Sequence, residues 1–290
     1  MRHTYILLFA LLLFTGCDKF KPSSTDQAAA AKPQRSAADI HLALLPNIDC
    51  LPFYYAEARG YYTAAGVSVE ILSCGSQTDC DTTLLGGTAE GAYMDQYRQA
   101  HLGRKADAYY SWLNTEGAWG IVTSGQSRIK KMKNLEGKTI AYDRNTSAEH
   151  FMEAAIKESG ATGVMHPQIN SLRVRASMVE ENQVDAAILP EPYLQEAVAL
   201  GCAKVYDVPV SQAAKGHILF SRTAMKQKGF HAKLDLLKDA YNQAVDSLNE
   251  RGVKDILPML QRVYGLSPDI AQKLKLPRYQ KKSANVSVKK

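Results

Sequence analysis

The sequence contains no stretch of apolar residues long enough to form a permanent membrane-spanning helix. Its main apolar run, Ile6 to Phe14, falls short of the roughly 20 residues that cross a bilayer. It also lacks common enzyme motifs: we find no G-x-S-x-G, no standard phosphate-binding glycine loop and no H-E-x-x-H. Glu149 and His150 are adjacent and therefore diverge on a helix. From the absence of these motifs we expect no catalytic residues and no cofactor.

Acidic residues are missing from the end of the chain. Residues 273–290 carry seven positive charges and no negative one: Lys273, Lys275, Arg278, Lys281, Lys282, Lys289 and Lys290. Subtracting these seven from the formal net charge of +6 leaves about −1 for the rest. We therefore interpret residues 271–290 as a basic, solvated C-terminal tail, and we expect no nucleic-acid partner.

The N-terminus has the features of an export signal. Positive charge at residues 1–3 precedes the short apolar run, and residues 14–17 (FTGC) resemble the lipobox of bacterial lipoproteins. This resemblance implies that residues 1–16 are a signal peptide and that Cys17 is acylated, for example with palmitate, which anchors the protein to a membrane on its periplasmic or extracytoplasmic face. The alternative is an ordinary cleaved signal with a chance cysteine. Residues 17–38, rich in Pro, Ser and Ala, are predicted to be a flexible stalk.

The folded part, beginning near residue 39, alternates strand-like and helical segments, which is the pattern of an α/β fold. The predicted strands are Ile40–Leu45, Val67–Ile71, Ala92–Met94, Lys138–Tyr142 and Val184–Leu189. The predicted helices are Thr78–Leu85, Ser147–Ser159, Glu191–Leu200 and a long amphipathic helix from Phe230 to Leu248. Two such α/β units would leave a cleft between lobes, and clefts of this kind bind ligands.

Three segments resemble a known family. "IHLALLPNIDCLPFYYAEARGYYTAAGVSVEI", "KNLEGKTIAYDRNTSAEHF" and "VDAAILPEPYLQEA" are similar, in order and spacing, to motifs of type II periplasmic solute-binding proteins of the group that captures nitrate, sulfonates, taurine or thiamine pyrimidine precursors. The resemblance implies a two-lobed fold in which each lobe has a mixed, mostly parallel sheet flanked by helices. We expect lobe 1 at residues 39–123 and 217–270, and lobe 2 at residues 124–216.

Polar residues follow the predicted strands, where ligands bind in α/β sheets. In the first lobe, Asn47, Asp49 and Cys50 form the turn after the first strand and are predicted to face the ligand. The alternative is that they are ordinary turn and cap residues. Some aromatic residues could also sandwich a flat ring. The candidates are Tyr54, Tyr93, Trp112, Trp119 and Tyr142.

In the second lobe, the turn after a strand opens a helix with the T-x-x-E capping pattern. Its amides and hydroxyls could hold an anion, whereas the nearby carboxylate favours a cationic or hydrogen-donating ligand, and the alternative is helix capping alone. The candidate residues here are Asp143, Asn145, Thr146 and Ser147. Glu191 and Tyr193, which open a later helix, are further candidates to accept hydrogen bonds and to stack, again with capping as the alternative.

Four cysteines remain if Cys17 is acylated. Cys74 and Cys80 are the closest pair in the chain and a possible disulfide, with Cys50 as an alternative partner, while Cys202 is expected to be buried and free. A metal or redox site built from the first three is a further hypothesis. Because no His lies at ligand spacing beside them, we predict no metal site.

These observations suggest a monomeric, lipid-anchored substrate-binding protein of an ABC importer. It would capture a small organic molecule, similar to a thiamine pyrimidine precursor or to a sulfonate or nitrate, and deliver it to a permease in the inner membrane. Two alternatives stay open. One is a metal-dependent enzyme related to pyrimidine-forming synthases, although their cysteine-rich motif and metal-binding His are missing here. The other is an extracytoplasmic sensor or accessory lipoprotein without a permease.

Overall fold

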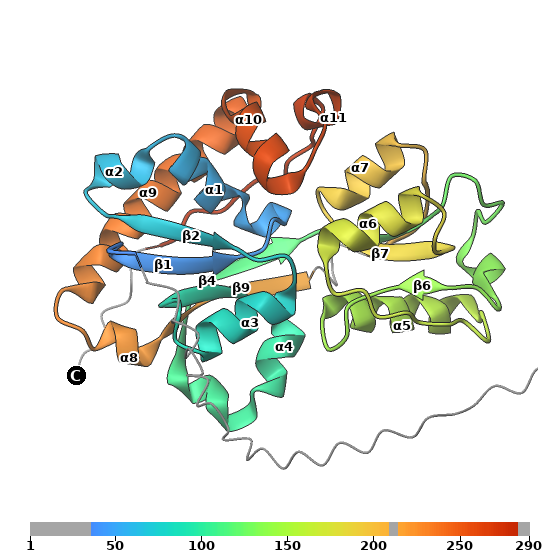
Figure 1. The fold of residues 1–290 in the computed structure, drawn as a ribbon, viewed down its shortest axis with the longest axis horizontal. Coiled ribbons are helices and arrows are strands. Elements are labelled where there is room, and N and C mark those ends of the chain that lie inside the picture. The colour runs from blue at the N-terminus through green and yellow to red at the C-terminus, as the bar shows by residue number, and fades with distance from the viewer. Residues whose placement is uncertain (1–35, 209–213, 284–290) are drawn as a thin grey trace, which may run out of the picture. The chain divides into compact units, whose positions relative to one another are not determined.

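A computed structural model describes residues 36–208 and 214–283. The predicted signal peptide, Cys17 and nearly all of the predicted stalk lie outside these residues. Within the described part, no helix combines the length and apolar character needed to cross a membrane. The described residues form two β-sheets with helices on both faces of each (Figure 1).

The first lobe is built on a five-stranded sheet in the order β2-β1-β3-β9-β4. The strands are β1 (Ile40–Leu44), β2 (Val69–Ser73), β3 (Gly91–Asp95), β4 (Tyr109–Gly117) and β9 (Ala214–Ser221). On one face lie α1 (Leu51–Ala58), α2 (Tyr61–Ala65) and α9 (Phe230–Arg251), and on the other α3 (Gln77–Leu85) and α4 (Gln96–His101) (Figure 1). This arrangement buries the tyrosine-rich segment of α1 against α9.

The second lobe is built on a four-stranded sheet in the order β6-β7-β5-β8. Its strands are β5 (Trp119–Thr123), β6 (Ile140–Ala141), β7 (Ala186–Pro190) and β8 (Ala203–Asp207). Three helices flank it: α5 (Ser147–Ser159) on one face, and α6 (Leu172–Glu180) and α7 (Tyr193–Ala199) on the other (Figure 1). The chain enters this sheet directly from β4, so the two lobes are joined by strands.

Short helical segments complete the described chain. They are the 3₁₀ turns Ile48–Cys50, Gly103–Ala108, Met132–Leu135 and Lys254–Ile256, the helices α8 (Arg222–Met225), α10 (Leu257–Met259) and α11 (Pro268–Gln272), and a π-helical turn at Leu260–Tyr264.

The two-lobed α/β fold is confirmed, and two details of the prediction are corrected. First, the change of sheet falls between Gly117 and Trp119, not after residue 123, and the return to the first sheet falls between Asp207 and Ala214. Second, the sheets are not mostly parallel: β1 pairs in parallel with β2 and β3, and β6 with β7, but β9 and β5 are each antiparallel to both neighbours. The strands that cross between lobes run against their neighbours.

An aromatic cluster forms the core of the first lobe. The ring of Phe53 lies 4.8 Å from that of Tyr241 and 6.2 Å from that of Trp112, and Phe220 meets Trp112 edge to face at 5.8 Å. These four side chains are nearly inaccessible to water. Tilted and edge-to-face ring pairs add about 0.5–1.5 kcal/mol each beyond the burial of their area. The aromatic content of α1 is therefore used mainly for packing between α1, β4 and α9.

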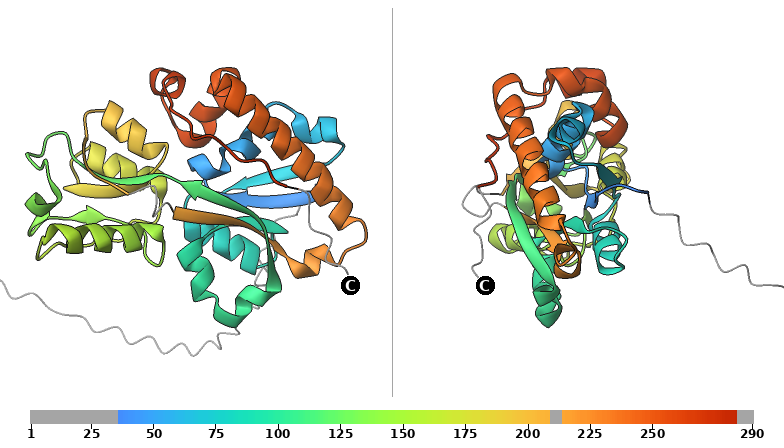
Figure 2. Two further views of the ribbon diagram at one scale, coloured as in Figure 1. Left: turned by 180° about the vertical axis from the view of Figure 1, so that it is seen from behind. Right: turned by 90° about the vertical axis from the view of Figure 1, so that its left-hand side faces the viewer.

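The end of the chain is not the solvated tail predicted from its charge. Residues 273–283, here called the C-terminal strap, run from α11 along α9 (Figure 2). Three side-chain amides each bond both the N–H and the C=O of one strap residue, at 2.8–3.0 Å: Gln195 holds Lys275, Asn249 holds Tyr279, and Asn242 holds Lys282. Apolar side chains within the segment explain the difference, because Leu274, Leu276 and Tyr279 pack against the core. The last residues, 284–290, lie outside the described part.

Candidate functional site

A small cavity lies between the two lobes, and we call it the interlobe cavity. Its volume is about 20 Å³, which is room for about one water molecule. The first lobe contributes Leu45, Asn47, Gln77, Tyr93 and Asp95, and the second contributes Trp119, Asp143, Thr146, Leu172, Arg175 and Pro190. Several of these residues lie at or just beyond the carboxyl ends of β1, β3, β6 and β7, where α/β sheets bind ligands.

Asp95 links the lobes through its carboxylate. It caps α4 by accepting a hydrogen bond from the backbone N–H of Tyr97 at 2.8 Å, and it accepts a second from the N–H of Ser147 at 3.1 Å. Ser147 is the first residue of α5 in the other lobe. Burial raises the pKa of Asp95, whereas these hydrogen bonds oppose the shift. The N-terminus of α5, predicted as a possible anion site, thus already faces a carboxylate of the protein itself.

Thr146 completes the start of α5. Its hydroxyl accepts from the N–H of Ala148 at 3.1 Å and donates to the backbone carbonyl of Asp143 at 2.8 Å. The carboxylate of Glu149 accepts from the N–H of Asn145 at 2.7 Å, and Asn145 has a left-handed backbone with φ of 58°. The capping role weighed for these residues is therefore present in the structure, and only Thr146 among them also lines the cavity with Asp143.

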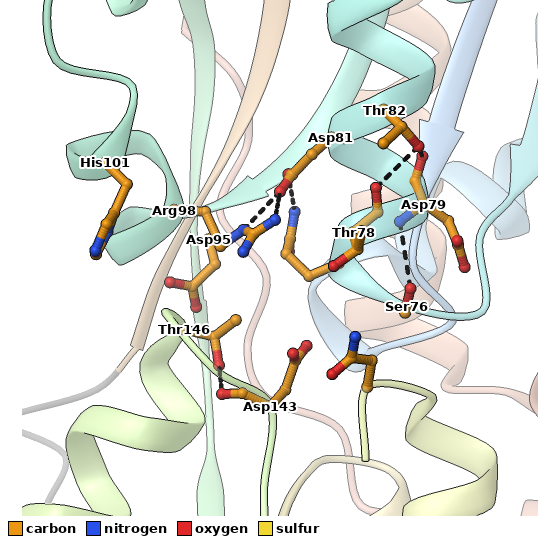
Figure 3. A network of polar contacts seen from close by, with 12 residues as sticks. Ser76, Thr78, Asp79, Asp81, Thr82, Asp95, Arg98, His101, Asp143 and Thr146 are labelled. Carbon is orange, nitrogen blue, oxygen red and sulfur yellow. Dashed lines mark hydrogen bonds and ion pairs between the residues drawn. The ribbon is translucent and has the colours of Figure 1, made fainter. Parts of the chain in front are cut away.

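Asp143 is a buried carboxylate without a hydrogen-bond donor. Its side chain points toward α3 of the first lobe (Figure 3), and no residue in the described part of the chain donates a hydrogen bond to it. Desolvation raises its pKa to about 6; the positive charge of Arg175 opposes this shift, and the negative charge of Asp95 adds to it. Such a group is an acceptor that the protein leaves unused.

A polar network lies on the first-lobe side of Asp143. Arg98 Nε donates to the carboxylate of Asp81 at 2.6 Å (Figure 3). Gln77 Nε2 donates to the same carboxylate at 2.8 Å. Gln77 Nε2 also contacts the backbone carbonyl of Tyr93 at 3.3 Å. The amide orientation is thereby fixed, and the carbonyl oxygen Oε1 of Gln77 is buried with no partner among the described residues.

Arg175 is the only cation among the described residues that line the cavity. It is fully buried, and its guanidinium donates from Nε to the carbonyl of Ile188 at 3.0 Å and from Nη1 to that of Ile169 at 2.7 Å. Its Nη2 has no partner in the described part of the chain. Burial lowers the pKa of Arg175 to about 10, and the group remains charged at neutral pH.

Five of the residues predicted from the sequence meet at this cavity: Asn47, Tyr93, Trp119, Asp143 and Thr146. Asn47 also caps the turn after β1, because its Oδ1 accepts from the N–H of Cys50 at 3.1 Å. The aromatic candidate Trp112 instead belongs to the aromatic core.

Other predicted residues lie elsewhere. Asp49 faces a different pocket beside the strap, where Thr115 donates to it at 2.8 Å and burial raises its pKa to about 6. Cys50 is buried in the core, and the hydroxyl of Tyr54 donates to the carbonyl of Leu44 at 3.1 Å. These three side chains do not line the interlobe cavity.

Glu191 and Tyr193 also do not line the interlobe cavity. Glu191 accepts from the backbone and side-chain amides of Gln195 at 3.1 and 3.0 Å, and it lines a groove of about 780 Å³ between α7 and the C-terminal strap. Tyr193 is buried beneath the guanidinium of Arg173, which lies 5.2 Å from the ring centroid. The geometry of this region thus favours the helix-capping alternative for Glu191.

The four described cysteines are buried and unpaired in the structure. Cys74 and Cys80 nevertheless lie within hydrogen-bonding reach of one another, and burial raises the pKa of the Cys80 thiol well above its usual value. The disulfide therefore stays a prediction. Across residues 36–208 and 214–283, no group of three or more His, Cys, Asp or Glu side chains is arranged to hold a metal ion, so the hypothesis of a metal site from Cys50 and these two thiols has no structural support.

Sequence reasoning missed Gln77, Asp95 and Arg175. Asp95 ends the strand that was predicted at residues 92–94, so the rule that singled out the other strand ends could have found it. Gln77 starts the helix after β2 and could have been found in the same way. Arg175 lies in the middle of α6, and nothing local in the sequence separates it from a surface arginine.

The sheets, their connection by crossing strands and the cavity between them define a periplasmic binding protein-like fold. The alkanesulfonate-binding protein SsuA from Xanthomonas axonopodis pv. citri, bound to MOPS, has this fold, with 16% identity and a TM-score of 0.65 over 81% of this chain and 82% of that chain. SsuA from Escherichia coli is 14% identical to this chain, with a TM-score of 0.63 over 81% of each chain. A ligand-binding component of an ABC-type import system from Staphylococcus aureus, solved with zinc, is 12% identical, with a TM-score of 0.66 over 81% of this chain and 82% of that chain.

At the level of family, the match covers most of the folded part. The NMT1/THI5-like family model matches residues 47–246, which is more than half of the chain, and the protein belongs to that family. A search of curated proteins gave no match.

Proposed function

We propose that this protein is the extracytoplasmic substrate-binding component of an ABC importer, which captures a small organic molecule between its lobes and delivers it to a permease. The observation that carries the proposal is the interlobe cavity, which is lined from each lobe by a residue with a buried polar atom that has no partner among the described residues. Unpaired polar atoms in a buried site are unfavourable by about 1–3 kcal/mol each unless a bound molecule or water satisfies them. A solute that satisfies them from both sides favours the closed arrangement of the lobes.

The relatives support this proposal. Those with the same fold include two sulfonate-binding proteins and a ligand-binding component of an ABC-type import system. A sulfonate, a nitrate-like anion and a thiamine pyrimidine precursor are therefore the solute classes to compare first. The cavity is too small for any of these in the state described, so binding requires the lobes to separate and close again around the solute.

Membrane attachment through an acylated Cys17 is part of the same proposal. A lipid anchor and a stalk of about 20 residues would keep the protein near the permease without a transmembrane helix. Metabolic labelling with an alkyne fatty acid tests the anchor: the wild-type protein is expected to incorporate the label, and Cys17→Ser is expected to lose it. Equal labelling of both forms would exclude Cys17 as the site.

A thermal-shift screen tests solute capture. Pyrimidines, sulfonates, nitrate and amino acids are added one at a time to the purified protein, each at several concentrations. A solute present at 100 times its Kd stabilises the folded state by about 2.7 kcal/mol, which raises Tm by roughly 5–11 °C for a protein of this size. If no solute of any class raises Tm, solute capture is not the function of this protein.

A further inference from the structure

The interlobe cavity has an uneven supply of hydrogen-bonding groups. On the acceptor side, the Asp143 carboxylate has no donor and Gln77 Oε1 has no partner within the described chain. On the donor side, Arg175 Nη2 is likewise unpaired in the described residues. All three residues are at least nine-tenths buried, and all three line the same cavity. A bound molecule must therefore donate at two points and accept at one.

The charges in the cavity point the same way. Asp95 and Asp143 are two acids lining it, against the single cation Arg175. Asp81, which lies behind them, is already neutralised by its ion pair with Arg98. The cavity therefore carries an excess of one negative charge when both acids are ionised.

The usual place for an anion is also taken. In many α/β proteins, anions bind at the N-terminus of a helix, where backbone N–H groups are free. Here the first N–H of α5 donates to Asp95, and the next donates to the hydroxyl of Thr146. An incoming sulfonate or nitrate would have to displace a carboxylate of the protein and then lie beside another one, so both steps disfavour an anion.

From this arrangement we propose that the solute is a small cationic nitrogen base, an amine or amidine, with at least two N–H donors and one acceptor group. Its donors bond Asp143 and Gln77, and its acceptor bonds Arg175. This proposal rests on the proposed function of solute capture and differs from what the sulfonate-binding relatives would suggest. Asp143 and Arg175, both from the second lobe, line the same cavity without forming an ion pair. The solute lies between them, and its contact with Gln77 of the first lobe bridges the lobes.

Calorimetric titration of the purified protein at pH 7.5 with five probes tests this class. 3-Aminopropanamide and 4-carbamoylbenzamidine are cations with N–H donors and a carbonyl acceptor, tetramethylammonium is a cation with neither, and ethanesulfonate and nitrate are anions. We expect binding by 3-aminopropanamide or 4-carbamoylbenzamidine, at least tenfold weaker binding by tetramethylammonium, and no binding by the two anions. Equal binding by tetramethylammonium would overturn the requirement for donors. Tighter binding by an anion would overturn the charge selection but leave solute capture intact.

Two variants place the effect at the cavity. Asp143→Asn keeps the size of the side chain and removes its charge, and we expect it to weaken binding of the donor cations at least tenfold, because a charge-assisted hydrogen bond is lost. Asp107→Asn is the matched control, because Asp107 is an exposed residue remote from the cavity lining. If the two variants bind the donor cations equally well, Asp143 is not a solute contact and the proposal fails.

The pH dependence of binding gives an independent readout. The groups that face Asp143 are Arg175 of α6, Arg98 of α4, Asp95 at the end of β3 and Asp81 of α3, and with desolvation they leave its pKa at about 6. Only the ionised form attracts a cation, so affinity for 3-aminopropanamide or 4-carbamoylbenzamidine should fall about tenfold from pH 7.5 to pH 5. Asp143→Asn should remove this dependence. A wild-type affinity that is flat over this range, or binding by none of the five probes, overturns the proposal; failure of the wider solute screen as well overturns solute capture itself.

Discussion

Replacing Asp143 by Asn should stabilise the solute-free protein, because the carboxylate is buried without a donor among residues 36–208 and 214–283. A rise of the Asp143 pKa from 3.8 to about 6 means that the folded state binds its proton more tightly than the unfolded state does. Stability is therefore lost as pH rises through the range between these two values. The loss reaches about 3 kcal/mol at pH 7.5 and is only about 0.5 kcal/mol at pH 4. Removing the carboxylate should recover up to these amounts.

The assay is urea unfolding of the wild-type protein and of Asp143→Asn at both pH values, with Asp107→Asn as control. We expect the variant to be more stable at pH 7.5, with an advantage that nearly disappears at pH 4. The control should differ from the wild-type protein by less than about 0.5 kcal/mol at either pH, as surface substitutions usually do. A variant that is no more stable at pH 7.5, or that gains as much at pH 4, would show that the unpaired carboxylate carries no electrostatic penalty. The combination of a more stable fold with weaker solute binding would mark Asp143 as a site residue whose charge is kept for function.

Three further predictions concern other parts of the fold. Asn249→Ala should lower the unfolding free energy by about 1–2 kcal/mol, because both hydrogen bonds to the strap residue Tyr279 are lost. The higher helix propensity of alanine offsets roughly 0.5 kcal/mol of this loss. Urea unfolding measures the difference, and an unchanged unfolding free energy would mean that Asn249 does not hold the strap. If Cys74 and Cys80 form a disulfide in the exported protein, thiol titration of the denatured protein should find two fewer reactive thiols before reduction than after it. Equal numbers before and after reduction would exclude the disulfide. Gly117→Ala should destabilise the protein by about 1–3 kcal/mol in the same unfolding assay, because a Cβ would overlap the carboxylate of Asp49, and wild-type stability would show that the crossing strand can shift.

Local signals in the sequence predicted several helices and most parallel strands well, whereas α4 and α6 were not predicted. Helix α5 has the predicted bounds, because Thr146 marks its start and Gly160, in the left-handed conformation, marks its end. Strand β1 differs from its prediction by one residue. Each of these elements is bounded by residues whose preference is expressed within a few positions of the chain.

The crossing strands were not predicted, and this explains the misplaced lobe boundary. Strands β4 and β9 pair although about 100 residues of sequence separate them, as Glu116 and Lys215 show. No short sequence pattern predicts which distant strand a strand will pair with. The change of sheet after Gly117 falls inside a nearly continuous extended segment, where composition does not change. Antiparallel pairing in both sheets follows from these crossings, and it depends on tertiary structure alone.

The candidate site was predicted only in part for the same kind of reason. Turn residues such as Asn47 and Asp143 could be chosen because they follow strands, but their neighbours in space could not. Whether the start of α5 is open to an anion depends on Asp95, which comes from the other lobe. The charge of the cavity is therefore a property of the two lobes in contact. The sequence alone left open whether the site would favour an anionic or a cationic ligand, because that depends on which residues of the first lobe meet the second.

The three side-chain amides that hold the C-terminal strap bond main-chain groups, which every residue except proline possesses. Substitutions at the three held positions, Lys275, Tyr279 and Lys282, therefore leave these attachments intact, and only proline removes the N–H. The charge of the strap can therefore change at Lys275 and Lys282 without loss of these attachments, whereas Leu274, Leu276 and Tyr279 are also constrained by their packing against the core.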